Sequence, residues 1–274
     1  GTQAWALDEV AKVLADPAGW SSTPCTLKTP IEFAQVLTDG ERIGWEEYEF
    51  ELHHAPGQTE FHSVIAAEVD GQKVAFTGDN VFTDLAPGRD GGLTEQLYQT
   101  TVLRNSYQLW MHHKCADVMD AVAADLICPG HRQVFAWNAA KGLEYRDFIE
   151  RNEQAVRRLT GELADVLVDV FWARLRPYLS HVAAGSQATY TLMLRNNYAE
   201  ERRFAARLLA PAGWATDREF AELTLGAGEK GELHLTATAP ASADIRRIVT
   251  AEIRIDGVTH GPIAEAVVTV TEGG

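Results

Sequence analysis

Three short segments combine histidine or aspartate with glycine, and each segment follows a stretch with the pattern of a β-strand. They are residues 53–63 (HHAPGQTEFHS), 76–80 (FTGDN) and 128–131 (CPGH). Imidazole and carboxylate groups bind zinc and similar ions when about four ligands converge at roughly 2 Å from the metal. Ligands far apart in the sequence can converge if strands carry their loops to one edge of a sheet. The three segments therefore predict a metal site assembled from separate loops.

The strands that would carry these loops are visible in the alternation of apolar and polar residues. Ser63 to Val69 and Lys73 to Thr77 form a predicted hairpin around Asp70-Gly71, and residues 45–52 alternate in places like a half-buried strand. Leu126 to Cys128 is a short apolar run that predicts a buried strand ending at Pro-Gly-His. These strands aim the loops at residues 53–62 and 78–82 toward the same end.

Helical spacing of apolar residues separates the strands. It predicts helices over Ala4–Leu14, from about Thr94 to Ala124, and from Ala139 to about Leu175, where Arg176-Pro177 ends the pattern. Strands that alternate with helices in this way indicate a layered α/β domain.

The pattern changes beyond Ser180, where short strands are broken by Gly, Asn and Pro and no helix is evident. The predicted strands are Ala188–Arg195, Arg203–Leu209, Leu223–Leu225, Glu232–Ala237, Ile248–Ile255 and Ile263–Val270. Short strands with turns at this spacing favour an all-β immunoglobulin-like β-sandwich. We therefore expect two domains, at residues 1–178 and 179–274.

The composition of the chain argues against several classes of binding partner. The 274 residues carry 39 acidic and 24 basic side chains, a formal net charge of -15, which argues against a nucleic acid or an anionic membrane surface as partner. No apolar run approaches the ~20 residues that cross a bilayer. Cys25, Cys115 and Cys128 lack CxxC spacing, so we expect free thiols in a reducing compartment and a cytoplasmic location.

Taken in order, the His-x-Pro-Gly-x-Thr loop, the Phe-x-Gly-Asp hairpin end, the helical stretch and the Pro-Gly-His strand end resemble the second half of the metallo-β-lactamase fold, over about residues 1–176. The resemblance implies half of an αββα sandwich and a hydrolytic centre with one or two zinc ions. It also implies that Asp79 bridges two metals and orients the nucleophile, and that His131 binds the second metal.

Two departures from the family pattern bear on activity. Gln58 stands where the family has a histidine, and an amide is a poor zinc ligand beside imidazole. The family's HxHxDH signature is absent from the 274 residues, because residues 112–117 (HHKCAD) have the wrong spacing and lie on a predicted helix. We expect a domain that lacks its N-terminal half, with weak zinc binding and no appreciable hydrolysis.

Each candidate ligand also has a simpler interpretation. Asp79 fits a turn without a metal, and His131 fits a satisfied loop histidine. His62 lies four residues after Gln58 and is a candidate to replace it as a metal ligand, or to support the ligands from behind. His54 is a further candidate ligand, and both His53 and His54 can simply flank the loop.

Two functions follow from these alternatives. The first is a metal-dependent hydrolase of a small-molecule substrate, truncated in this chain. The second is a degenerate, metal-free fold that serves as a binding or oligomerisation module. Truncation would expose an apolar sheet face, so we expect a homodimer or an association with the absent N-terminal half. The C-terminal sandwich, with Asn196-Asn197 followed by Pro211-Ala212-Gly213-Trp214, loosely resembles appended immunoglobulin-like modules, which implies packing, dimerisation or ligand positioning without catalysis of its own.

Overall fold

The computed structural model describes residues 3–17, 29–87, 92–100, 107–161, 168–169, 171–217 and 219–272. The chain forms two compact units, one of residues 1–15 with 31–168 and the other of residues 16–30 with 169–274. The sequence placed the boundary between residues 178 and 179, whereas the chain divides between Val168 and Asp169 in the structure.

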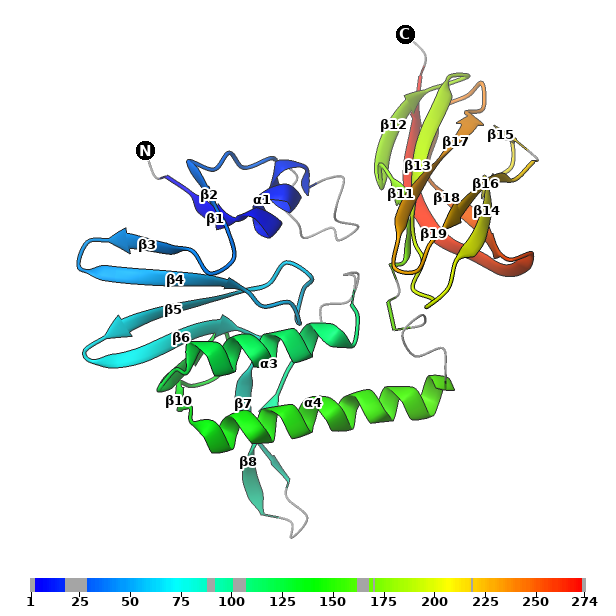
Figure 1. Cartoon of the computed structure of the whole chain (residues 1–274). Coiled ribbons are helices and arrows are strands. Elements are labelled where there is room, and N and C mark those ends of the chain that lie inside the picture. The colour runs from blue at the N-terminus through cyan, green and yellow to red at the C-terminus, as the bar shows by residue number, and fades with distance from the viewer. Residues whose placement is uncertain are drawn as a thin grey trace. The chain divides into compact units, whose positions relative to one another are not determined.

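Six strands form the main sheet of the first unit, in the order β10-β9-β6-β5-β4-β3 (Figure 1). Their bounds are Arg42–Trp45 (β3), Tyr48–His54 (β4), Ser63–Val69 (β5), Gln72–Gly78 (β6), Leu126–Pro129 (β9) and Phe135–Ala136 (β10). All neighbours are antiparallel except β6 and β9, which run parallel. Because β6 and β9 run parallel, their C-terminal ends lie at the same edge of the sheet. The two strands are far apart in sequence because parallel neighbours need a long crossover connection.

The hairpin predicted around Asp70-Gly71 is present. Val69 pairs with Gln72, and the two turn residues have φ values of 52° and 78°. Two consecutive residues with positive φ suit the right-handed twist of the flanking strands, and Asp-Gly adopts that conformation at low cost. This turn fixes the register of β5 against β6.

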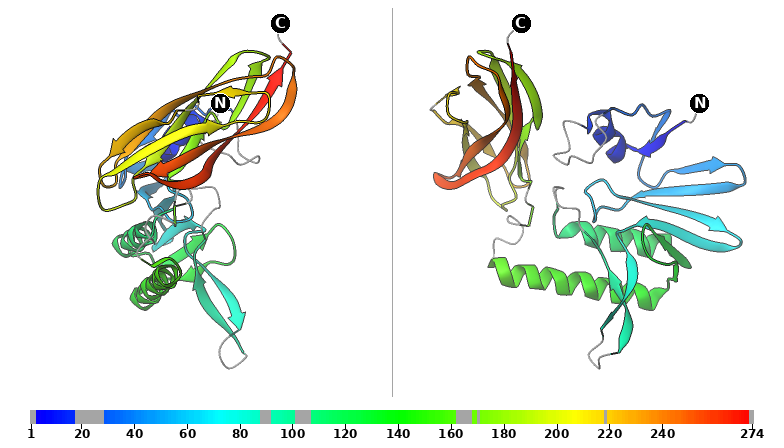
Figure 2. Two further views of the ribbon diagram at one scale, coloured as in Figure 1. Left: turned by 90° about the vertical axis from the view of Figure 1, so that its right-hand side faces the viewer. Right: turned by 180° about the vertical axis from the view of Figure 1, so that it is seen from behind.

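Two helices cover one face of the sheet, α3 (Trp110–Val122) and α4 (Ala139–Thr160), and they run side by side (Figure 2). Asn138 caps α4 by accepting a hydrogen bond from the Lys141 backbone N–H at 3.0 Å. The buried core on this face joins strand and helix residues, among them Val64, Ala66, Ala75, Ile127, Met119, Val122, Tyr145 and Ile149. Within the described ranges, no helix combines the length and the apolar character needed to span a bilayer.

The opposite face of the sheet is packed by the start of the chain. The helix predicted over Ala4–Leu14 is present but begins later, as α1 (Asp8–Ala15). A strand, β1 (Trp5–Leu7), precedes it and pairs in parallel with β2 (Gln35–Leu37). Leu7 and Leu37 pack on Leu52 in a small separate core. Both faces of the main sheet therefore carry apolar residues.

The prediction of a helix from about Thr94 is wrong at its start. Residues Leu93–Tyr98 form β8, which pairs with β7 (Phe82–Pro87) in a two-stranded hairpin that projects from the helical layer (Figure 1). Phe82 and Tyr98 stack across the pair with ring centroids 5.8 Å apart. Leu97 is buried in the core from this strand, and the interrupted apolar spacing of the segment fits either a helical or a strand period.

The helix predicted to reach about Leu175 is also shorter than expected. α4 ends at Thr160, where Gly161 adopts a positive φ of 61° that suits glycine. Ala173–Arg176 is a strand, β11, which pairs with a strand of the second unit. The apolar run at residues 163–171 lies largely outside the described residues.

The second unit is a β-sandwich, as predicted, with sheets in the orders β11-β13-β17-β15 and β12-β19-β18-β14-β16. The strands are Ala173–Arg176 (β11), Leu179–Ala183 (β12), Gln187–Arg195 (β13), Arg202–Leu209 (β14), Ala215–Thr216 (β15), Ala221–Leu225 (β16), Lys230–Thr238 (β17), Asp244–Ile255 (β18) and Val258–Thr271 (β19). Each strand predicted from sequence lies within one of these. Alternate residues such as Tyr190, Leu192, Phe204 and Val268 fill the core between the sheets.

Candidate functional site

Asp79 and His131 meet at the ends of two parallel neighbouring strands. Gly78, the last residue of β6, pairs with Pro129, the last residue of β9, so the residues that follow emerge side by side. The Nδ1 atom of His131 lies 2.9 Å from Oδ1 and 2.8 Å from Oδ2 of Asp79. The Asp79 side chain is 17% exposed and that of His131 is 77% exposed. The structure thus brings together the two residues on which the resemblance most depends.

Gly130 makes this close approach feasible. Its backbone N–H donates to the Gly78 carbonyl at 2.6 Å. A Cβ atom on residue 130 would stand 2.9 Å from Asp79 Oδ1 and 3.2 Å from the Gly78 backbone, nearer than ordinary contacts allow. The glycine of the Pro-Gly-His segment is therefore required by the space between the two strand ends.

Gly130→Ala is expected to push His131 away from Asp79 and to lower the free energy of unfolding by about 1–3 kcal/mol, the usual cost of overpacking. Urea denaturation measures the loss. Gly44→Ala is the matched control, because a Cβ there meets nothing within 4 Å. Equal stability of the two variants would contradict the tight contact.

Gln58 completes the group at Asp79. Its Nε2 atom donates to Asp79 Oδ2 at 2.9 Å and to the Thr100 hydroxyl at 3.2 Å. The Thr100 hydroxyl in turn donates to the Asp79 backbone carbonyl at 3.0 Å. Gln58 thus lies at the site, with one amide N–H directed at the carboxylate and the other at the Thr100 hydroxyl.

His62 faces the β6 backbone. Its Nε2 atom lies 2.9 Å from the Thr77 carbonyl, and burial lowers the pKa of its imidazole, against the opposing effects of that hydrogen bond and of the Asp79 charge. A neutral ring must donate to the carbonyl from Nε2, which leaves Nδ1 as the nitrogen with a lone pair. His62 therefore stabilises the end of β6 through its backbone. Ligation of a metal by His62 stays a prediction.

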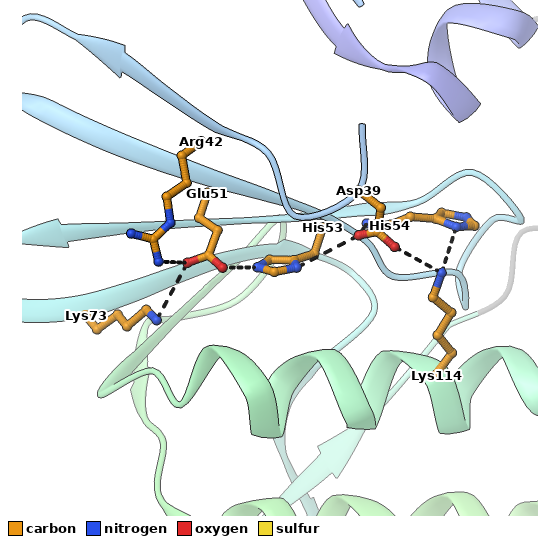
Figure 3. Close-up of polar contacts among 7 residues, drawn as sticks. All are labelled: Asp39, Arg42, Glu51, His53, His54, Lys73 and Lys114. Carbon is orange, nitrogen blue, oxygen red and sulfur yellow. Dashed lines mark hydrogen bonds and ion pairs between the residues drawn. The ribbon is translucent and has the colours of Figure 1, made fainter. Parts of the chain in front are cut away.

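His54 lies in a different set of contacts (Figure 3). Its Nδ1 atom is 3.1 Å from Lys114 Nζ and its Nε2 atom is 2.7 Å from the Glu60 carbonyl. Because an ammonium group can only donate, Nδ1 accepts and Nε2 donates. Both ring nitrogens are therefore engaged with protein groups, and ligation by His54 would require these contacts to break.

His53 lies in a row of polar and charged side chains that come from several elements (Figure 3). Its Nε2 atom lies 3.0 Å from a Glu51 oxygen, off the direction of a hydrogen bond, and its Nδ1 atom lies 3.9 Å from Asp39. Burial opposes ionisation of Asp39, but the His54 backbone N–H and the Lys114 charge outweigh it and lower the pKa of this carboxyl. The row joins the β2–β3 turn to α3 and does not include Asp79.

The HHKCAD segment lies on α3, as the sequence predicted. His112 and Cys115 are buried, and burial raises the pKa of the Cys115 thiol to about 11. The same effect, with the nearby His113, lowers the pKa of His112 to about 4. His113 instead contacts Glu153 on α4 at 2.8 Å. These residues are structural parts of the helical layer.

The chemistry available at the site comes from one carboxylate, one exposed imidazole and one amide. Across the described part of the chain, no group of three or more His, Cys, Asp or Glu side chains is arranged to hold a metal ion. Asp79 and His131 supply two zinc-type donors, whereas a complete site needs about four. Sequence reasoning missed the role of Thr100, which carries no ligand pattern of its own.

Comparison with known proteins found no matching family model and no matching curated protein. Among solved structures, similar chains include a metallo-β-lactamase family protein from Thermus thermophilus, with 16% identity, a TM-score of 0.41, and coverage of 59% of this chain and 57% of that one. A Cronobacter sakazakii metallo-β-lactamase described by a HARLDQ motif has 14% identity, a TM-score of 0.33, and coverage of 59% and 54%. This chain thus spans little more than half the length of either.

The sandwich has neighbours of a different kind. WR4, a Caenorhabditis elegans member of the MSP family, has 9% identity, a TM-score of 0.27, and coverage of 36% of this chain and 98% of that one. At these similarities, the role of an individual residue does not carry over from one protein to another.

Proposed function

We propose that the first unit carries part of a metal-dependent hydrolytic centre of the metallo-β-lactamase type, in which Asp79 and His131 are two ligands of a zinc ion. The contact between Asp79 and His131 Nδ1 at 2.8 Å carries this proposal. Two donors that already lie within hydrogen-bond distance can turn toward a shared ion with small side-chain movements. The fit is partial, since the other ligands must be water or side chains outside this group.

A bound zinc ion would supply Lewis-acid polarisation of a substrate oxygen and a more acidic water. The residues of the chain then have distinct parts. Asp79 would orient the attacking water. His131, whose ring is solvent-exposed, would bind the ion from the solvent side. The substrate would be a small molecule with a carbonyl, phosphoryl or thioester oxygen.

Zinc titration of the 274-residue chain by calorimetry tests the proposal. The binding free energy of a four-ligand zinc site is about 10–16 kcal/mol. Two ligands that supply about half of it correspond to a Kd of roughly 1–200 μM. Asp79→Asn is expected to abolish this binding, whereas Asp84→Asn, which alters a carboxylate paired with Arg132, should leave it unchanged. We expect no appreciable zinc-dependent hydrolysis by this chain.

Absence of zinc binding in the parent chain, or equal binding in the Asp79→Asn variant, would exclude Asp79 as a ligand. Measurable zinc-dependent turnover by the 274 residues would show that the ligand set is larger than two.

A metal-free binding or oligomerisation module is the second candidate, and Gln58 favours it. The amide donates to Asp79 Oδ2 and His131 faces both carboxylate oxygens, so Asp79 has partners without a metal. Large apolar side chains on the main sheet are also exposed, including Phe76 at 41% and Trp45 at 59%. Under this candidate the parent chain binds no zinc and light scattering gives the mass of a homodimer.

A further inference from the structure

The backbone of the loop that carries Gln58 is hydrogen-bonded to one buried side-chain amide. Asn80, the residue after Asp79, is fully buried. Its Oδ1 atom accepts from the Gln58 backbone N–H at 2.6 Å, and its Nδ2 atom donates to the Ala55 carbonyl at 2.5 Å. One side chain thus satisfies both ends of the turn from residue 55 to residue 58.

Only an amide of this length suits the two contacts. The turn offers one N–H donor and one carbonyl acceptor, and a side-chain amide presents the complementary pair. Aspartate would set an acceptor against the Ala55 carbonyl, and serine is too short to reach both groups. The types of the two partners also settle which end of the Asn80 amide is oxygen.

The turn lies pressed against Asn80 and α3. A Cβ atom on Gly57 would stand 2.7 Å from Asn80 Oδ1 and 2.8 Å from His112 Nδ1. Asn80 Nδ2 also lies 3.4 Å from Cys115 Sγ, and its backbone carbonyl accepts from the Tyr145 hydroxyl at 3.4 Å. Asn80 therefore connects the turn to both helices of the layer.

We infer that Asn80 is a positioning residue, which sets where the Gln58 side chain meets Asp79 by fixing the Gln58 backbone. Asp79 and Asn80 are consecutive, so the segment that bears the carboxylate also holds the loop that contacts it. Displacement of the Gln58 backbone relative to Asp79 requires release of the Asn80 amide. The consequence for zinc rests on the proposed function, whereas the consequence for the loop does not.

Amide hydrogen exchange followed by NMR tests the loop. Asn80→Ala is expected to reduce the protection of the Gln58 N–H at least tenfold while the amides of β5 and β6 stay protected. Asn80→Ser, which leaves a smaller cavity, keeps the test valid if the alanine variant unfolds. Cys115→Ala is the matched control, because it removes the sulfur contacts to the Asn80 amide and to Tyr145 but leaves the bond from the Gln58 N–H to Asn80 in place. Unchanged protection at Gln58 in a folded Asn80 variant would overturn the inference.

A double-mutant cycle tests the link to Asp79. Gln58→Ala and Asn80→Ala are each expected to tighten zinc binding about fivefold, the worth of one competing hydrogen bond at Asp79 Oδ2. The double variant should bind no more tightly than Gln58→Ala, because Asn80 acts through Gln58. An undiminished effect of Asn80→Ala in the Gln58→Ala background would overturn the inference. If no protein in the cycle binds zinc, the proposed function fails, and hydrogen exchange still decides the role of Asn80.

Discussion

Zinc is expected to bind about 100-fold more tightly to the Gln58→His variant than to the parent chain. The Gln58 side chain already ends 2.9 Å from Asp79 Oδ2, and the imidazole of histidine reaches about as far. Four ligands together contribute roughly 10–16 kcal/mol in structural zinc sites, so one added ligand is worth about 3 kcal/mol. The substitution also removes the amide donor that occupies the carboxylate.

Calorimetric titration with zinc measures the change. Gln72→His is the matched control, because Gln72 is exposed at the opposite end of β6, and its zinc affinity should equal that of the parent. A Gln58→His variant with parental affinity would show that Asp79, His131 and residue 58 do not converge on one ion.

The free energy of unfolding is expected to fall by about 3 kcal/mol between pH 7 and pH 4 because of His112 alone. The pKa of this buried imidazole is about 4 in the folded chain, against an ordinary value of 6.5. Below pH 6.5 the unfolded chain therefore takes up a proton that the folded chain does not, and stability is lost as the pH falls toward 4. One pKa unit corresponds to about 1.4 kcal/mol.

Urea denaturation at several pH values isolates this contribution. Among the described residues, the groups that face the ring supply no counter-charge. Tyr107 packs against it, Gly57 lies close to both the ring and Asn80, and His113 opposes protonation. His112→Gln should lose less stability in acid than the parent by about 3 kcal/mol. His181→Gln, at an exposed histidine on β12 of the second unit, should keep the parental loss. Identical acid losses in the parent and His112→Gln would show that His112 is protonated equally in both states.

The strands that bear the candidate site could be predicted because local chemistry and tertiary structure agree there. Asp70-Gly71 suits a tight hairpin turn, and Leu126 to Cys128 is too short and too apolar for anything but a buried strand. The contact between Asp79 and His131 agrees with the resemblance, which implies that both residues bind metal at one site. The short strands of the sandwich were also found, since turn residues mark their ends.

The elements that sequence reasoning misplaced depend on distant partners. β8 is a strand because it pairs with β7 and stacks Tyr98 on Phe82, and β11 is a strand because β13 lies beside it. The partners of His54 are equally non-local, as Lys114 is 60 residues away. The contacts of Asn80 with the Gln58 loop have no sequence signal, because the sequence does not distinguish a buried asparagine that bonds another loop from one that only forms a turn.

Asp79 and His131 are 52 residues apart, and they meet only after β9 has docked beside β6. Closing a loop of that length loses chain entropy before its contacts form, which places this step among the slower ones in folding. A ligand that bridges the two side chains would stabilise only the states in which β9 is already paired with β6. Such a ligand would lengthen the lifetime of the native state and leave the rate of refolding almost unchanged.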